Sequence, residues 1–534
     1  MPSSSSSSPS PDSSDSADLQ EQSEVLEWLE ELVADRSRLA GLSSGFRDRL
    51  LRACGQLIRP DPLERSIYRK ARKRKALDAR RQSDESVLDR TGIRTQRLSL
   101  VYPTPEVRGD GPQQPGLAEG QKQVSERLLD ARSCYVCKSS FHDVHDFYDA
   151  LCPKCAAFNW SKRTQSSDMT GRVALLTGGR VKIGYQVGIK LLRAGARLIV
   201  TTRFPRDAAA RYAREPDFGE WQDRLAVFGL DLRHTPSVEA LCAHLVRTEK
   251  RLDVVINNAC QTVRRPPGFY GHLMEAEAMP LGQLAEGARV VLADYEALRV
   301  DGSLPPLGEG TGASDLPEAA ARQQERSPRE LAGLTLSAAL SQLALVEGDE
   351  RAEDALFPQG RLDADLQQVD LRGVNSWRLP LHAVSTVELL EVTLVNAVAP
   401  FVLDARLKPL MMRTQGRDKH IVNVSAMEGQ FYRAFKTDKH PHTNMAKAAL
   451  NMLTRTSAPD YQRDGIHMNA VDTGWITDED PHHITLQKRD EHGFHPPLDH
   501  VDAASRILDP VFVGLETGEH LWGQFLKDYK PAPW

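Results

Sequence analysis

Long apolar runs are absent from this sequence. No stretch of about 18 consecutive apolar residues occurs, which is the length that a membrane-spanning helix needs. The N-terminus also lacks the basic and apolar regions of a secretory signal peptide. We therefore expect no membrane partner and a cytoplasmic location, with the nucleus as the alternative.

Cysteine and excess charge are scarce as well. The 534 residues include only 7 cysteines, four of them in two tight pairs, which favours a metal in a reducing compartment over a disulfide framework. With 68 basic and 73 acidic residues, the formal net charge is −5, which excludes a chain-wide polycation. The basic run from Arg69 to Arg81 is interpreted as a solvated helix face, with a nuclear-import or nucleic-acid patch as the alternative. We therefore do not expect nucleic acid as the main partner, although the basic run leaves it as an alternative.

Composition divides the first part of the chain. Residues 1–18 are rich in serine and proline and predict a disordered tail. Residues 19–102 carry apolar side chains at helical spacing and predict a helical region. Residues 103–122 are rich in proline, glycine and glutamine and are expected to be a linker. A compact cysteine module is predicted over residues 123–165.

The cysteine module contains Cys134 and Cys137, then fourteen residues, then Cys152 and Cys155. Two such pairs can supply four thiolates to one tetrahedral zinc ion. Four protein ligands leave no open position, so the predicted zinc is structural. Disulfides are the alternative. A protein partner that binds through this module is a further hypothesis.

From residue 171 onward, short apolar runs alternate with helical segments. This alternation predicts an α/β fold, a Rossmann-like doubly wound parallel sheet over residues 171–534. A long insertion, residues 262–380, interrupts it and is expected to be partly helical, as a lid or subdomain. The expected strands are 173–177, 197–202, 225–230, 254–257, 420–424, 467–471 and 520–525, and the expected helices are 185–194, 386–413, 444–462 and 501–516.

The first of these strands leads into a glycine-rich turn. It ends in Thr177-Gly178-Gly179, and Ile183-Gly184 follow where the next helix begins. Glycines allow a tight turn and a close approach to a pyrophosphate, which the positive N-terminus of the helix then attracts. The second strand ends in Thr201-Thr202-Arg203. Together these features predict a dinucleotide site.

At these motifs the chain resembles the short-chain dehydrogenase/reductase family, from about Gly171 to Phe525 without the insertion. The shared markers are Thr177, Gly178, Gly184, Asp231, Asn257-Asn258-Ala259, Asn396 and Lys447-Ala-Ala-Leu450. The resemblance implies dimers or tetramers, which the zinc module and the insertion could block. It implies a dinucleotide held by Thr177, Gly178, Lys182, Ile183, Gly184, Arg203, Asp231, Asn257, Asn258, Ala259, Lys447, Gly474 and Ile476, with Asp231 at the adenine.

The residues after the second strand select the cofactor. An acid there would bind the ribose of NAD, whereas an arginine suits the 2′-phosphate of NADP. The chain has Arg203 and no acid, so we expect NADP rather than NAD. Lys182 stands where the family usually has glycine. Its side chain could contact a phosphate of the cofactor or could simply be solvated, and the sequence does not decide between the two.

The catalytic residues depart from the family. There a tyrosine transfers the substrate proton, a lysine lowers the pKa of that tyrosine and binds the nicotinamide ribose, a serine holds the carbonyl, and an asparagine anchors a proton-relay water. Here Asn396 and Lys447 match, Thr443 stands in the tyrosine position, and the serine is either Ser425 or replaced by Ala426. A threonine hydroxyl is far less acidic than a phenol and is shorter by a ring.

Another proton donor would then be needed. The candidates are Tyr432, His440, His442 and Glu428, each with a purely structural alternative. Two functions follow from the resemblance. One is an atypical NADP-dependent oxidoreductase that acts on the carbonyl or alcohol of an unknown small molecule. The other is a catalytically silent NADP(H)-binding protein that serves in assembly or partner recognition through its zinc module.

Overall fold

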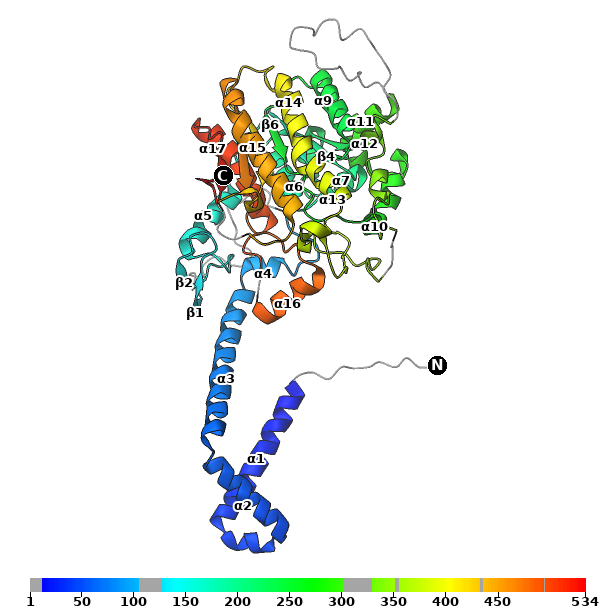
Figure 1. The fold of residues 1–534 in the computed structure, drawn as a ribbon. Helices are drawn as coiled ribbons and strands as arrows, with labels where there is room; N and C mark the ends of the chain where they lie inside the picture. The colour runs from blue at the N-terminus through cyan, green and yellow to red at the C-terminus, as the bar shows by residue number, and fades with distance from the viewer. Residues whose placement is uncertain (1–11, 105–125, 302–328, 351–354, 433–435, 494) are drawn as a thin grey trace. The chain divides into compact units, whose positions relative to one another are not determined.

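A computed structural model describes residues 12–104, 126–301, 329–350, 355–432, 436–493 and 495–534 (Figure 1). The chain forms two compact units, residues 1–82 and residues 83–534. The first unit contains α1 (Asp12–Ala34), a 3-10 turn (Arg36–Gly41), α2 (Ser44–Ile58) and most of α3 (Pro62–Asp89). Rings of Trp28 and Phe46 meet edge to face between α1 and α2.

The serine-rich start of the chain differs from expectation in part. Residues 12–18, which composition assigns to a disordered tail, form the first turns of α1 instead. Aspartate and serine are favoured at helix N-termini, where they interact with free backbone amides and the helix dipole. Residues 1–11 lie outside the described residues. The basic run Arg69–Arg81 lies on α3 with its side chains exposed.

The second unit begins with the cysteine module. Strand β1 (Arg127–Ser133) pairs antiparallel with β2 (Ser140–Asp143), and α5 (Pro153–Thr164) follows. The short helix α4 (Gly92–Gln96) precedes it. Of the predicted linker, residues 105–122 lie outside the described residues, while Pro103 and Thr104 accept and donate hydrogen bonds on the second unit.

An eight-stranded sheet confirms the predicted α/β class. Its strand order is β10-β9-β8-β7-β6-β3-β4-β5, parallel except for the antiparallel β10–β9 pair. Strands β3 to β8 are buried on both faces, which explains the apolar runs of β3, β4 and β6. The strands are β3 (Val173–Thr177), β4 (Arg197–Thr202), β5 (Leu225–Gly229), β6 (Val254–Asn257), β7 (Lys419–Ser425), β8 (Ile466–Asp472), β9 (Phe525–Lys527) and β10 (Lys530–Ala532).

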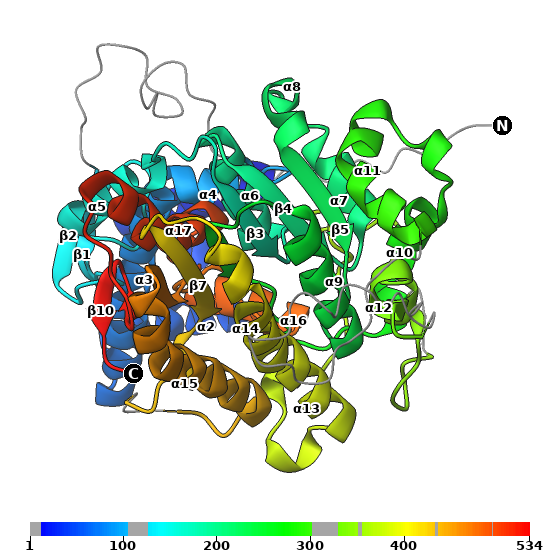
Figure 2. The ribbon, with the colours of Figure 1, turned by 90° about the horizontal axis from the view of Figure 1, so that it is seen from above.

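Helices cover both faces of the sheet. Figure 2 shows α6 (Lys182–Arg193) and α17 (His500–Thr517) on one side, and α9 (Thr235–Thr248), α14 (Ala399–Met411) and α15 (Pro441–Arg463) on the other. Helix α13 (Thr386–Thr393) continues into α14 through a π-helical turn, Leu394–Val398. Other helices of the domain are α7 (Pro205–Tyr212), α8 (Phe218–Trp221) and α16 (His482–His492).

The predicted last strand is misplaced. Of residues 520–525, only Phe525 belongs to β9. The His520 ring stacks on His467, with centroids 4.4 Å apart, and Gly523 takes the left-handed φ of 63°. These two features hold the segment as a loop until Phe525, where its main chain joins β8.

Among the described residues, one helical stretch, Thr386–Met411, is long and apolar enough to cross a membrane by length and composition alone. This is weak evidence, because core helices pass the same test. Val402, Leu403 and Leu407 of this stretch are buried in the main hydrophobic core beside the sheet.

The insertion is partly helical, as expected. It contains α10 (Pro267–Ala278), α11 (Glu286–Asp301), α12 (Ala332–Thr335) and several 3-10 turns, and residues 302–328 and 351–354 lie outside the described residues. Helix α11 packs on β5 and α7, and α10 packs on α7. The insertion is therefore joined to the edge of the sheet where β4 and β5 lie.

Candidate cofactor and catalytic site

A cleft of about 320 Å³ opens at the carboxyl ends of β3, β4, β5 and β6. This edge of a parallel sheet is where α/β proteins bind ligands. Eight residues predicted to hold a cofactor line it: Gly178, Lys182, Ile183, Gly184, Arg203, Asp231, Asn258 and Ala259. Thr177 and Asn257 are buried at the ends of β3 and β6. Of the loop that contains Gly474 and Ile476, Thr477 lines the cleft.

The glycine turn is locked to the end of β6. Thr177 Oγ1 accepts hydrogen bonds from the amides of Asn258 and Ala259, both at 3.0 Å. A Cβ on Gly178, whose φ is 70°, would lie 2.9 Å from Ala259 Cα. A Cβ on Gly184 would lie 2.1 Å from Gly178 O. Both glycines are thus required by packing, and they leave the start of α6 open to the cleft.

Lys182 lies in this turn with a left-handed φ of 54°, a conformation that costs a lysine free energy. Its side chain lines the cleft instead of extending into solvent. Burial favours the neutral amine, but Glu479, Asp365 and Asp363 outweigh burial and raise the pKa of Lys182. Lys182 therefore places a positive charge in the cleft at the start of α6.

Arg203 is held by the insertion. Its guanidinium donates to Tyr270 Oη at 2.7 Å and to Ser341 Oγ at 3.3 Å, and it lies 4.7 Å from the centroid of the Tyr270 ring. Its hydrogen-bond partners are thus uncharged, although its positive charge is one of the causes that lower the pKa of Asp231. The neutral partners orient the guanidinium and leave its charge available to a ligand.

Asp231 is already engaged. Arg233 donates to both of its carboxylate oxygens, at 2.6 Å for the closest pair. Burial disfavours the charged carboxylate, but the hydrogen bonds and charge of Arg233 outweigh burial and lower the pKa of Asp231. The predicted contact of Asp231 with adenine would therefore share the carboxylate with Arg233.

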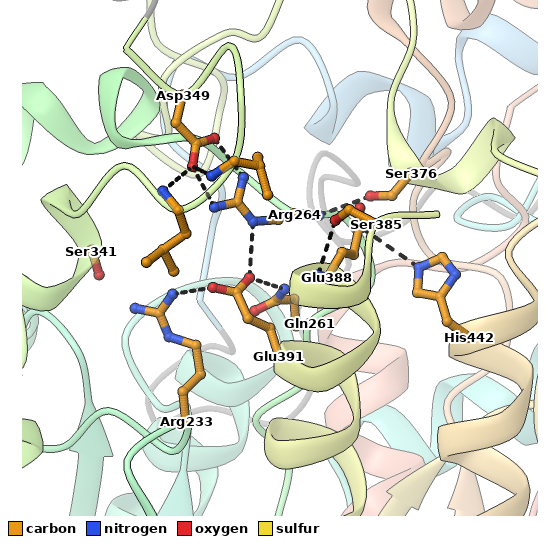
Figure 3. A network of polar contacts seen from close by, with 12 residues as sticks. Arg233, Gln261, Arg264, Ser341, Asp349, Ser376, Ser385, Glu388, Glu391 and His442 are labelled. Atoms are coloured by element: carbon orange, nitrogen blue, oxygen red, sulfur yellow. Dashed lines mark hydrogen bonds and ion pairs between the residues drawn. The ribbon is translucent and has the colours of Figure 1, made fainter. Parts of the chain in front are cut away.

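A polar network joins the cleft to the insertion (Figure 3). Buried Glu391 of α13 accepts hydrogen bonds from Arg233 at 2.6 Å, Gln261 at 3.0 Å and Arg264 at 3.1 Å. Arg264 also forms a two-pronged ion pair with Asp349, at 2.6 and 2.7 Å. The residues after β6 are thereby fixed between α13 and the insertion.

Asn396, Lys447 and Ser425, three of the predicted catalytic residues, are buried, and none of them lines the cleft. Asn396, in the π-helical turn, accepts from the Gln261 amide at 2.8 Å and donates to the Gln261 carbonyl at 3.1 Å. Lys447 Nζ donates to Val424 O at 2.7 Å. Ser425 Oγ donates to Asn451 Oδ1 at 2.6 Å.

Thr443 and the candidate proton donors differ in burial and in contacts. Thr443 Oγ1 is buried and has no hydrogen-bond partner among the described residues. His442 Nε2 lies 3.6 Å from Glu388 Oε1. The His440 ring stacks on Trp377 with centroids 3.9 Å apart. Tyr432 is 82% exposed, unlike the buried residues around Thr443.

The four cysteines converge as the sequence predicts. Their sulfurs all lie within 4.8 Å of one another, with Cys137 Sγ and Cys152 Sγ 3.6 Å apart, and all four thiols are free. Sulfurs at the corners of a tetrahedron around zinc, at about 2.3 Å, would be about 3.8 Å apart. Hydrogen bonds from Ser139 lower the pKa of the exposed Cys137 thiol to about 6. Burial raises the pKa of the Cys152 and Cys155 thiols, so the fit to zinc rests on the geometry of the cluster and on its four sulfur ligands.

Family models match two segments. The short chain dehydrogenase model covers residues 172–271, and the enoyl-(acyl carrier protein) reductase model covers residues 369–496. The insertion separates the two matches. Both segments carry residues of the cleft.

Among curated proteins, the uncharacterized protein R665 of Acanthamoeba polyphaga mimivirus is 30% identical over 416 residues, covering 74% of this chain and 75% of that protein. Retinol dehydrogenase 14 of Mus musculus is 36% identical over 116 residues, 19% of this chain and about a third of that enzyme. A metagenomic short-chain oxidoreductase with NADP matches 67% of this chain and 97% of its own, at 15% identity and a TM-score of 0.36.

Proposed function

Because the chain belongs to the short-chain dehydrogenase/reductase family, we propose that it is an NADP-dependent oxidoreductase acting on a carbonyl or alcohol without the usual tyrosine. The observation that carries this proposal is the cleft over the start of α6, in which glycine is required at Gly178 and Gly184. The amides and dipole at a helix N-terminus favour a pyrophosphate.

Arg203 supports NADP over NAD. The end of β4 carries no acid that would bind the ribose hydroxyls, and Tyr270 and Ser341 orient the guanidinium in the cleft. Arginine's planar group suits a phosphate. The Arg203→Asp variant should therefore weaken NADPH binding more than NADH binding. Equal losses of both affinities would contradict the preference for NADP.

NADP would supply or accept the hydride, and the chain's own residues would place the substrate and move a proton. Asn396 holds the main chain at Gln261, and Lys447 lies beside the end of β7. Thr443 is a poor acid, so the proton would come from a different group. His442 is one candidate for that group, since it is buried with its Nε2 3.6 Å from Glu388 Oε1.

A specific observation favours a catalytically silent NADP(H)-binding protein as the second candidate. Lys447 donates to Val424 O and Ser425 donates to Asn451, so both side chains already bind groups of the protein. Tyr432 is exposed. NADPH titration followed by a screen of aldehydes, ketones and alcohols separates the two. Tight binding without turnover supports the silent protein, turnover supports the oxidoreductase, and absence of nucleotide binding refutes both.

Structural zinc is the second part of the proposal. The four sulfurs of the cysteine cluster match a closed tetrahedral site, which would stabilise the module around it. Metal analysis of the purified protein should find about one zinc per chain. A melting temperature that does not change on chelation would contradict a structural zinc.

We also propose a homo-oligomer in the cytoplasm or nucleus. Apolar side chains are exposed along α13, α14 and α15, namely Leu390, Phe401, Met445 and Met452. Such residues favour a protein interface when they cluster. Size-exclusion chromatography with light scattering would show a monomer if this is wrong.

A further inference from the structure

The cysteine module and the cleft share one hydrophobic core. Cys134, Cys152, Phe147 and Ile476 are buried in the same cluster, and Ile183 packs against it. Ile183 lines the cleft, and Ile476 belongs to the loop after β8 whose Thr477 lines it too. The module is thus continuous with one wall of the dinucleotide cleft.

Tyr135 forms the direct polar contact between them. It follows the ligand Cys134, and its amide donates to Ala150 O at 2.9 Å. Its hydroxyl oxygen accepts a hydrogen bond from the Trp475 amide at 3.0 Å. A Cβ on the preceding Gly474, whose φ is 83°, would lie 3.5 Å from the same oxygen. The side chain of Tyr135 therefore rests on the main chain of the loop 474–477.

The module also holds the first turns of α17. Tyr148 Oη donates to Asp502 at 2.5 Å, and Arg163 donates to Asp499 at 2.7 Å. His500, between these two acids, lines the cleft. It is buried, and neither ring nitrogen has a hydrogen-bond partner among the described residues. The module therefore determines where two parts of the cleft wall lie, namely His500 and the loop 474–477.

We propose that the metal-loaded cysteine cluster positions the loop 474–477 through Tyr135, so that zinc occupancy controls dinucleotide affinity. This inference rests on the proposed NADP-binding function. The four cysteines would hold the zinc ion, which would fix Cys134 and, through it, the backbone of Tyr135. Tyr135 then holds the Trp475 amide, so loss of the metal frees the loop. Tyr135 is a positioning residue, since it touches the loop and not the cofactor.

The test compares Tyr135→Phe with the matched variant Tyr461→Phe. Tyr461 Oη also makes one hydrogen bond to the main chain, donating to Asp404 O at 2.9 Å. A single net hydrogen bond is worth about 0.5–1.5 kcal/mol, which converts to about a 2- to 13-fold change. NADPH affinity of the zinc-loaded protein, measured by fluorescence, should fall by about this factor in Tyr135→Phe and stay unchanged in Tyr461→Phe.

A second measurement does not depend on the cofactor. Amide hydrogen exchange at Trp475 should accelerate by about 2- to 13-fold in Tyr135→Phe, and further after zinc is removed with a chelator. Unchanged exchange at Trp475 in Tyr135→Phe overturns the inference, even where chelation unfolds the module. If the zinc-loaded wild type binds neither NADPH nor NADH, the proposed function fails, while the exchange rates still decide whether Tyr135 positions the loop.

Discussion

Replacing Glu391 with glutamine should destabilise the second unit, because one buried carboxylate serves three donors. Glu391 is 5% exposed and accepts from Arg233, Arg264 and Gln261. Glutamine keeps the shape of the side chain and removes the charge. Its amide nitrogen is a donor that takes the place either of the oxygen that accepts from Arg233 or of the oxygen that accepts from Arg264 and Gln261. The substitution therefore removes both the charge and one acceptor from the network in Figure 3.

The size of the loss follows from the two charged donors. A hydrogen bond to a charged group contributes about 1.5–3 kcal/mol, and the amide nitrogen of glutamine cannot accept the bond of one of the two arginines. Asp231 and Asp349 still neutralise Arg233 and Arg264. The expected decrease in the free energy of unfolding is therefore about 2–3 kcal/mol and not the larger cost of an unpaired buried charge.

Urea denaturation followed by circular dichroism measures this loss, with Glu239→Gln as the control. Glu239 accepts from Arg406 at 2.9 and 3.0 Å, but the Arg406 side chain is 60% exposed. Exposed ion pairs contribute at most about 1 kcal/mol. A loss in Glu391→Gln no greater than that in Glu239→Gln would refute the buried network as a source of stability.

Two further predictions concern the cleft and the amino end of the sheet. Gly184→Ala should abolish NADPH binding because its Cβ would lie 2.1 Å from Gly178 O, whereas Gly219→Ala, with open space around the Cβ, should bind normally. Isothermal titration of both variants checks this, and equal affinities would contradict it. Burial, His467 and His520 hold the pKa of His420 well below its usual value, and the neighbouring charges are Asp418 and Arg172. As the pH falls, His420 is protonated in the unfolded state before it is protonated in the folded state. The contribution of neutral His420 to stability is therefore fully present above about pH 6.5 and is lost as the pH falls below that value. When the pH falls from 7.5 to 5.5, the melting temperature should therefore decrease more in the wild type than in His420→Asn. Equal changes in the two proteins would refute a role for His420. The variant is needed because burial raises the pKa of Asp404 to about 7, which acts in the opposite direction.

The sheet was predictable because its strands are buried on both faces. Such strands appear in the sequence as short apolar runs, and β3, β4 and β6 begin and end where those runs do. Short strands at the edge of the sheet and exposed helices have no apolar run that would predict them. Helix α16 has the sequence HHITLQKRDEH, without apolar periodicity, and β10 has three residues, so neither was expected.

The glycine turn was predictable because its glycines are close in sequence and each meets a local requirement. Gly178 has a positive φ, and Gly184 packs against Gly178 O. The partners of Arg203 were not predictable, because Tyr270 and Ser341 lie 67 and 138 residues away in the insertion. No periodicity or motif relates these positions. The hydrogen bond between Tyr135 and Trp475, 340 residues apart, is hidden from the sequence for the same reason.

The insertion and the cysteine module each hold one part of the cleft wall. The insertion orients Arg203 through Tyr270, and the cysteine module holds the loop of Trp475 through Tyr135. Both contacts act on groups proposed to bind a dinucleotide, and neither reaches Thr443. Contacts that order a binding site in advance reduce the entropy lost on binding. Both contacts should therefore raise the affinity for the proposed cofactor, whether or not a proton donor replaces the tyrosine.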